Sequence, residues 1–161
     1  MVPNAASVGL DVTLTDNDQL LVIDLAALGS AGGNVSITGN LMLQSVDLSG
    51  LQTVGGSLTV TGNPGLNAIL ISGVTSIGGD LTVVGTAATV IDVSALTTVT
   101  GSLDISGNTS ATAINVGALT DVTGGLTIGG NTAADPIDVG SLTTVGGGLD
   151  ISGNSSATTI D

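Results

Sequence analysis

The chain has 161 residues, of which 42% are hydrophobic, and it carries a formal net charge of -13 without a single Lys, Arg or His. Nucleic-acid binding is excluded because no cation is available to neutralise phosphates, and binding to anionic membrane surfaces is excluded for the same reason. No apolar run approaches the ~18 residues of a membrane span, which excludes membrane insertion. The uncompensated negative charge suits divalent cations or a basic partner instead.

The sequence repeats itself with a period of about 23 residues, a length typical of solenoid repeats. The unit that starts at Ile77 is one residue shorter than the others. Residues 1–7 form a leader that completes a partial coil, because Val2 to Ser7 have the length and register of the six missing positions. Residues 1–161 are therefore predicted to form a single repeat domain. Its seven units start at Val8, Ala31, Val54, Ile77, Val99, Val122 and Val145.

Each unit contains three short segments with the spacing of β-strands. One segment spans the junction between units, as at Leu119 and Val122, and the next has apolar fifth and seventh positions, as at Leu103 and Ile105. The last alternates from position sixteen to position eighteen, starting for example at Ile114. Alternation with a period of two indicates strands, and no segment has helical spacing. The predicted fold class is therefore all-β: a single-domain parallel β-solenoid (β-helix) with about seven coils of about 23 residues and three short strands per coil.

Two positions mark the turn after the second predicted strand. The ninth position is Gly in six units and Asp16 in the first, which predicts a backbone with positive φ. The tenth is Asn in every unit except at Thr86, and stacked Asn side chains are predicted to bond to one another and to the turn backbone. The shorter unit is predicted to lack one residue of its variable turn, near Thr86 to Val90.

The segments LTTVTGSLDISGN and AINVGALTDV resemble the repeat of receptor L-domains and their microbial surface relatives, which are solenoids related to leucine-rich repeats. The resemblance covers about residues 8–161 and depends on L-x-I-x-G-N, V-x-G and I-D-V occurring together. It implies an extracellular or cell-surface location and a binding or scaffolding role without catalytic residues. Unlike that family, the chain lacks aromatic residues, cations and cysteines.

The composition argues against catalysis. No His, Cys, Lys, Glu or Tyr is available as a base or nucleophile, and no Arg can hold an anion. Two Asp carboxylates could in principle hydrolyse a glycosidic bond, but a sugar cleft without an aromatic or cationic residue would be unusual. We therefore expect a protein that is not an enzyme and that needs no organic cofactor.

The seventeenth position forms an acidic column that consists of Asp24, Asp47, Asp92, Asp138 and Asp161, broken by Leu70 and Asn115. Stacking brings neighbouring carboxylates within about 5 Å, where they repel and where calcium would relieve the repulsion. Candidate calcium ligands are Asp24, Asp47, Asp138 and Asp161. A solvated acidic stripe without specific metal is the favoured alternative, because no D-x-D-x-D-G calcium loop is present.

The leading functional hypothesis is a non-enzymatic extracellular structural protein, a surface or filament-forming solenoid. Both ends of a solenoid expose open strand edges, which predicts head-to-tail association with further copies of the chain. The alternative is a ligand-binding or adhesion module of the L-domain class. Two less favoured alternatives are an ice-binding protein, whose Thr-x-Thr rows break down after three coils, and a designed or excised repeat array.

Overall fold

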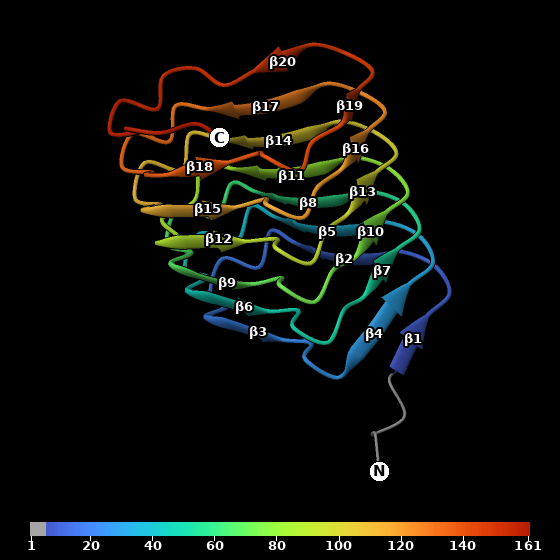
Figure 1. Ribbon diagram of the computed structural model, residues 1–161. Helices are drawn as coiled ribbons and strands as arrows, with labels where there is room; N and C mark the ends of the chain where they lie inside the picture. Colours follow the sequence, from blue (N-terminus) through green and yellow to red (C-terminus); the bar gives the residue numbers. More distant parts are fainter. Residues whose placement is uncertain (1–5) are drawn as a thin grey trace.

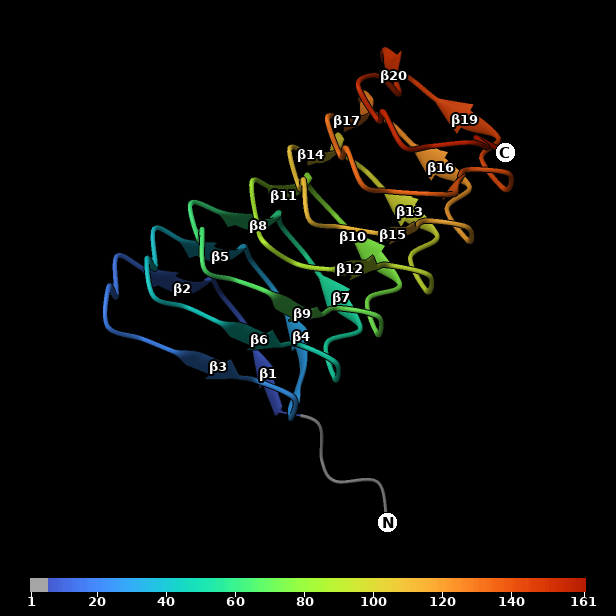
Figure 2. The same cartoon turned by 90° about the vertical axis from the view of Figure 1, so that its left-hand side faces the viewer.

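The computed structural model describes residues 6–161, which form a parallel β-solenoid without any helix (Figure 1). Each complete coil contributes three short strands, and the equivalent strands of successive coils pair in parallel along the stack, as Figure 2 shows. The predicted all-β solenoid is therefore confirmed. Residues 1–5 of the predicted leader lie outside the described residues, and the described part contains no helix able to cross a membrane.

The strands form two long sheets and a divided third face. The first sheet contains β1 (Ala6–Val8), β4 (Leu28–Ala31), β7 (Thr53–Val54), β10 (Ser76–Ile77), β13 (Thr98–Val99), β16 (Asp121–Val122) and β19 (Thr144–Val145). The second sheet contains β2 (Val12–Thr15), β5 (Val35–Thr38), β8 (Leu58–Thr61), β11 (Leu81–Val84), β14 (Leu103–Ser106), β17 (Leu126–Gly129) and β20 (Leu149–Asp150). The third face contains β3 (Val22–Asp24), β6 (Ser45–Asp47) and β9 (Ala68–Leu70), followed by β12 (Val90–Asp92), β15 (Ala113–Asn115) and β18 (Ile137–Asp138).

The pairing register follows the sequence repeat. Val8 pairs with Ala31, the equivalent residue of the next unit, and Ala31 pairs with Val54 in the unit after that. The seven stacked strands of each long sheet make six such steps, which corresponds to about six turns of solenoid. Because the spacing between paired strands is about 4.8 Å, each repeat position becomes a column of side chains parallel to the solenoid axis.

The unit that starts at Ile77 is shortened where the sequence predicts it. Leu81 pairs with Leu103, one residue short of a full repeat, whereas Ile91 pairs with Ile114, a full repeat further on. The missing residue therefore lies in the turn between β11 and β12. Most coils close this turn with a backbone hydrogen bond such as Leu66 N–H to Asn63 O, whereas Ala88 N–H points to the hydroxyl of Thr86.

The shortened turn coincides with a break in the third face. In the described chain β9 and β12 belong to two separate three-stranded sheets, although they are consecutive strands of that face. The exposed side chains of Leu70 and Val90 flank the break. We attribute the break to the missing residue, because a shorter turn changes the path by which the chain enters β12.

The core is a set of aliphatic columns. The inward residues of interior coils, such as Leu58, Val60 and Leu103, are no more than 1% exposed. β-Branched and γ-branched side chains suit this pleated interior, and each buried one contributes roughly 1.5–3 kcal/mol. At the C-terminal end the equivalent Leu149 is 55% exposed because no further described coil covers it.

The glycines of the ninth position have the predicted positive φ. Gly39, Gly62, Gly85, Gly107, Gly130 and Gly153 have φ values between 65° and 68°. Asp16 takes the same left-handed conformation in the first coil, with φ of 56°. The turn thus directs the chain out of the second sheet and positions the following asparagine column.

Candidate functional site

The asparagine column, formed by the tenth position of the repeat, is buried between the second sheet and the third face. The Oδ1 atom of Asn63 accepts a hydrogen bond from the backbone N–H of Asn40 in the preceding coil, at 2.9 Å. The Nδ2 atom of Asn63 donates to the backbone carbonyl of Ile37 in that coil, at 2.8 Å. The column also contains Asn17, Asn108, Asn131 and Asn154. Its interior members are fully buried, so the predicted structural role is confirmed.

The two ends of the asparagine column carry complementary free groups. Asn17 is exposed, and among the described residues its Oδ1 accepts no hydrogen bond. At the other end, Asn154 bonds to the preceding coil through both side-chain atoms, while its backbone N–H donates to no described residue. The column therefore presents an acceptor at its N-terminal end and a donor at its C-terminal end.

A second polar column, which we call the corner column, occupies the fourth position of the repeat between the first and second sheets. Its members are Asp11, Asn34, Ser57, Asp80 and Ser102, followed by Gly125 and Gly148. Each polar side chain accepts the backbone N–H of the next coil, as Asp80 Oδ1 does from Ser102 N at 2.7 Å. The sequence interpretation missed this column; its signal is that only Asp, Asn, Ser and Gly occur at this position.

The acidic column of the seventeenth position caps backbone turns. The Oδ1 atoms of Asp24, Asp47 and Asp138 each accept the backbone N–H two residues further on, at 2.9 to 3.1 Å. This is an Asx-turn, in which Asp hydrogen-bonds its own local backbone. Asp92 makes the same contact with Ser94 N–H at 3.0 Å. A structural role therefore explains these carboxylates without a ligand.

The candidate calcium ligands lie in two separate pairs. Asp24 is the register partner of Asp47, and Asp161 lies beside Asp138 because Ile160 pairs with Ile137. Residues 6–161 contain no group of three or more acidic side chains arranged to hold a metal ion. Since calcium takes six to eight oxygen ligands, each pair would need additional backbone or water oxygens, and calcium binding stays a prediction.

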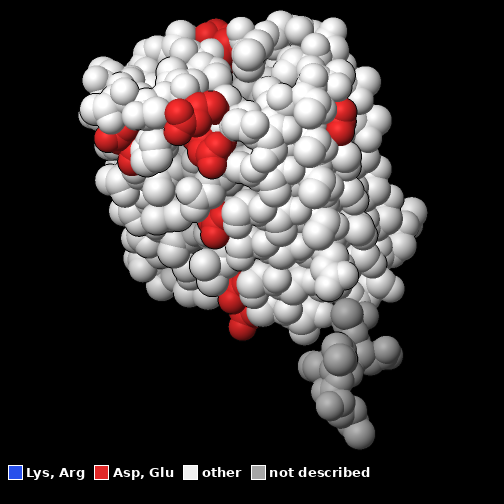
Figure 3. Space-filling view, in the orientation of Figure 1, with Lys and Arg blue, Asp and Glu red and all other residues white. Residues whose placement is uncertain are grey.

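Every charged side chain of the protein is acidic. On the face seen in Figure 3 the acidic side chains form separate small groups with no basic side chain between them. Two carboxyl groups have lowered pKa values: the hydroxyl and then the N–H of Ser49 lower the pKa of Asp47, and the N–H and then the hydroxyl of Thr158 lower that of Asp135. Hydrogen bonds to the ionised form cause both shifts.

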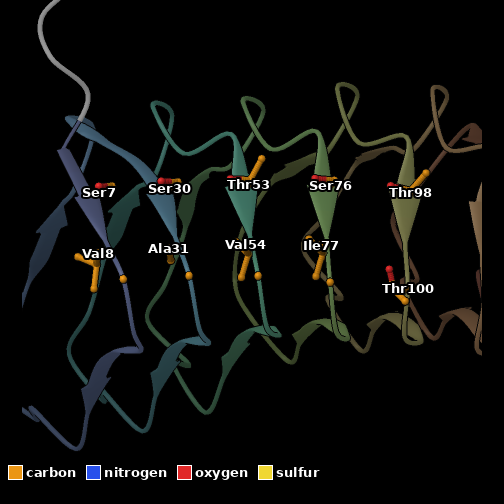
Figure 4. A pocket seen from close by; sticks show the side chains of 14 residues that line it. Ser7, Val8, Ser30, Ala31, Thr53, Val54, Ser76, Ile77, Thr98 and Thr100 are labelled. Carbon is orange, nitrogen blue, oxygen red and sulfur yellow. The ribbon is translucent and has the colours of Figure 1, made fainter.

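An open groove of about 510 Å³ runs along the outer face of the first sheet from β1 to β13. Figure 4 shows its row of hydroxyl side chains: Ser7, Ser30, Thr53, Ser76 and Thr98. The glycines on the floor of the groove are required by the close stacking of the coils, because a Cβ atom on Gly55 would overlap the backbone oxygen of Gly32. The groove therefore offers hydroxyl and backbone groups without an ionisable side chain.

The threonine rows on the outer face of the second sheet are irregular. Asp104 lies in register between Thr82 and Thr127, and Gly129 follows Ser106 in the next row. One carboxylate oxygen of Asp104 is shielded from solvent without a hydrogen-bond partner, for which we have no physical account. These interruptions disfavour a regular array of hydroxyl groups for ice.

No family model matches this chain, and neither the curated proteins nor the solved structures include a match. The coarse part of the L-domain resemblance, a parallel β-solenoid, is confirmed by the strand pairing. The narrower assignment to receptor L-domains receives no support from these comparisons.

Proposed function

We propose that the protein is a non-enzymatic structural protein of the cell surface or extracellular space whose solenoids assemble end to end. The observation that carries this proposal is the complementarity of the two ends of the asparagine column. The extracellular location is supported by the resemblance to surface solenoids and by the absence of Lys and Arg, which removes every trypsin cleavage site.

The free groups at the two ends match the contacts inside the stack. Within the chain, Asn131 N–H donates to Asn154 Oδ1, and Asn154 Nδ2 donates to Ile128 O. If a second copy continues the repeat, Asn154 N–H donates to Asn17 Oδ1 of that copy, and the Nδ2 of this Asn17 donates to Ile151 O. Two N-terminal ends brought together would not present these donor–acceptor pairs, so the junction is polar, head to tail.

The apolar end faces favour the same arrangement. In this register β2 of the second copy lies over β20, which places Val12 over Leu149 and Leu14 over Ile151. The equivalent interior residues Leu126 and Ile128 are 0% exposed, whereas Leu149 is 55% exposed. Covering the end coil therefore removes aliphatic surface from water, the largest favourable term in protein association. Open strand edges add backbone hydrogen bonds.

Electron microscopy and light scattering of the full chain test the proposal over a range of concentrations in about 0.5 M NaCl, where charge repulsion is screened. We expect unbranched filaments whose length increases with concentration. Asn17→Ala removes two junction hydrogen bonds and should raise the critical concentration by about tenfold or more, at roughly 1 kcal/mol per bond. The matched control is Gln19→Ala, an exposed residue of the same turn.

A chain that stays monomeric at high concentration in low and high salt, with its terminal coils ordered, would refute end-to-end assembly. If filaments form but Asn17→Ala behaves like Gln19→Ala, the copies associate through a different surface or register. Circular dichroism of both variants checks that each retains the β-solenoid.

The groove along the first sheet favours a second candidate function, binding of an extended neutral polymer such as a polysaccharide. Its hydroxyl row repeats once per coil and could bond to a linear chain with a similar repeat. An NMR titration with soluble neutral glycans, in which the chemical shifts of the hydroxyl-row residues are monitored, tests this second function. Shifts confined to Ser30, Thr53 and Ser76 would support binding, and their absence at millimolar glycan would contradict it.

A further inference from the structure

The acidic column never stacks more than two carboxylates within the chain. Asp24 and Asp47 are register partners, and the next position is Leu70. The remaining members in order are Asp92, Asn115, Asp138 and Asp161, with Asn115 paired to both of its neighbours. The two carboxylate pairs therefore occupy the two ends of the solenoid, and neutral side chains interrupt the column between them.

The spacing of the column makes these interruptions physically important. Stacked positions lie about 4.8 Å apart, where two unit charges in water repel enough to change an equilibrium constant about fourfold. The chain contains no cationic side chain that could neutralise a longer run of carboxylates. A run of three or four charged neighbours would thus oppose the stacking of the coils that carry them.

We propose that Asp24 and Asp161 form a charge gate at the head-to-tail junction. This inference rests on the proposed end-to-end assembly. In the register set by the asparagine column, Asp161 lies beside Asp24 of the next copy, and the two terminal pairs merge into a run of four carboxylates: Asp138, Asp161, Asp24 and Asp47. Assembly is therefore opposed at low ionic strength and released when salt screens these charges.

No other pair of charged side chains meets directly at this junction. The repeat register places each of the remaining acidic residues of the end coils opposite a neutral one. These pairs are Asp11 with Gly148, Asp16 with Gly153, Asp18 with Ser155, and Thr13 with Asp150. The charged side chains that face Asp24 are thus Asp47 in its own chain and Asp161 and Asp138 across the junction, so the side-chain repulsion at the junction is concentrated in this column.

The expected effect of removing one charge follows from Coulomb's law. Asp24→Asn removes the repulsion from Asp161 at about 5 Å and from Asp138 at about 10 Å, which together correspond to about an eightfold lower critical concentration in dilute buffer. In 1 M salt the Debye length is about 3 Å, so the difference should fall below about twofold. Asn already occupies the column at Asn115, so the fold accepts this side chain there.

The matched control is Asp92→Asn. Asp92 lies in the same column, makes the same backbone contact and carries the same charge, but it lies in the middle of the solenoid, away from both ends. Asp92→Asn removes one negative charge, as Asp24→Asn does, and should change the critical concentration by less than about twofold. Asp161→Asn should reproduce the effect of Asp24→Asn from the opposite side of the junction.

The experiment measures the critical concentration of the full chain and of the three variants by light scattering, from about 10 mM to about 1 M NaCl at neutral pH, a range over which the Debye length falls from about 30 Å to about 3 Å. A selective gain for Asp24→Asn and Asp161→Asn that disappears in high salt supports the gate. Equal gains for all three variants would overturn it, since the repulsion would then depend only on net charge. Failure of every variant to elongate at any salt concentration would instead refute the end-to-end assembly on which the gate depends.

Discussion

Replacement of Asn108 by Ala tests whether the asparagine column holds the coils together. Asn108 is fully buried, and its side chain connects two coils. Its Oδ1 accepts hydrogen bonds from Thr86 N at 3.0 Å and Thr86 Oγ1 at 2.9 Å, and its Nδ2 donates to Val83 O at 2.9 Å. Ala removes all three bonds and leaves the buried backbone N–H of Thr86 without its partner, while the Thr86 hydroxyl keeps only its contact with Ala88 N–H.

The expected cost follows from these contacts. A buried hydrogen bond contributes about 1 kcal/mol net, and a buried group left without its partner costs about 1–3 kcal/mol. Both Thr86 and Val83 are at most 5% exposed, so water cannot readily replace the lost partner. We therefore expect Asn108→Ala to lower the free energy of unfolding by about 3–5 kcal/mol. With a urea m-value of about 2 kcal/mol/M, the unfolding midpoint should fall by about 2 M.

The assay is urea unfolding followed by far-UV circular dichroism, because the chain has no Trp or Tyr for fluorescence. Asn17→Ala is the matched control, since it makes the same substitution in the same column at an exposed end. We expect this control to lose less than about 1 kcal/mol. An Asn108→Ala midpoint within about 0.3 M of the control, at about equal m-value, would refute the view that the buried column stabilises the stack.

Two further predictions concern the aspartates. Because the pKa values of Asp47 and Asp135 are lowered in the folded chain, their contribution to stability is present above the unfolded pKa of about 4 and is lost as pH falls through the lower folded values. The melting temperature should thus decrease below about pH 4, and Asp47→Asn or Asp135→Asn should flatten this decrease; an unchanged slope in both variants would contradict the assignment. If the two carboxylate pairs bind calcium, millimolar CaCl₂ should raise the melting temperature and EDTA should reverse it, whereas a shift equal to that in NaCl of matched ionic strength would leave the pairs as turn caps.

Much of the fold follows from the periodicity of the sequence. When one phrase recurs at a constant interval, stacking one coil on another superimposes equivalent positions, and the inward aliphatic residues, the ninth-position glycines and the asparagine column are all predicted correctly. The sequence also predicts where the shorter unit lacks a residue, because the repeat motifs before and after the turn that precedes β12 both stay in register with the neighbouring units.

The polar contacts between coils were harder to predict from the sequence. The corner column mixes Asp, Asn and Ser, so it appears as a variable position, and its role emerges only when Asp80 is seen to accept the N–H of Ser102 in the next coil. Likewise, the sequence left the acidic column open between a solvated stripe and a calcium site, and the turn contacts of Asp24 and Asp47 are seen only in the structure.

The sequence by itself determined which residues stack, since that depends only on the count of residues per coil. The tertiary structure decided which stacked groups bond, because a hydrogen bond depends on the relative height and direction of two backbones, and no periodicity specifies these. The split between β9 and β12 is the clearest case: one missing residue keeps the columns in order on both long sheets, yet it separates two neighbouring strands on the third face.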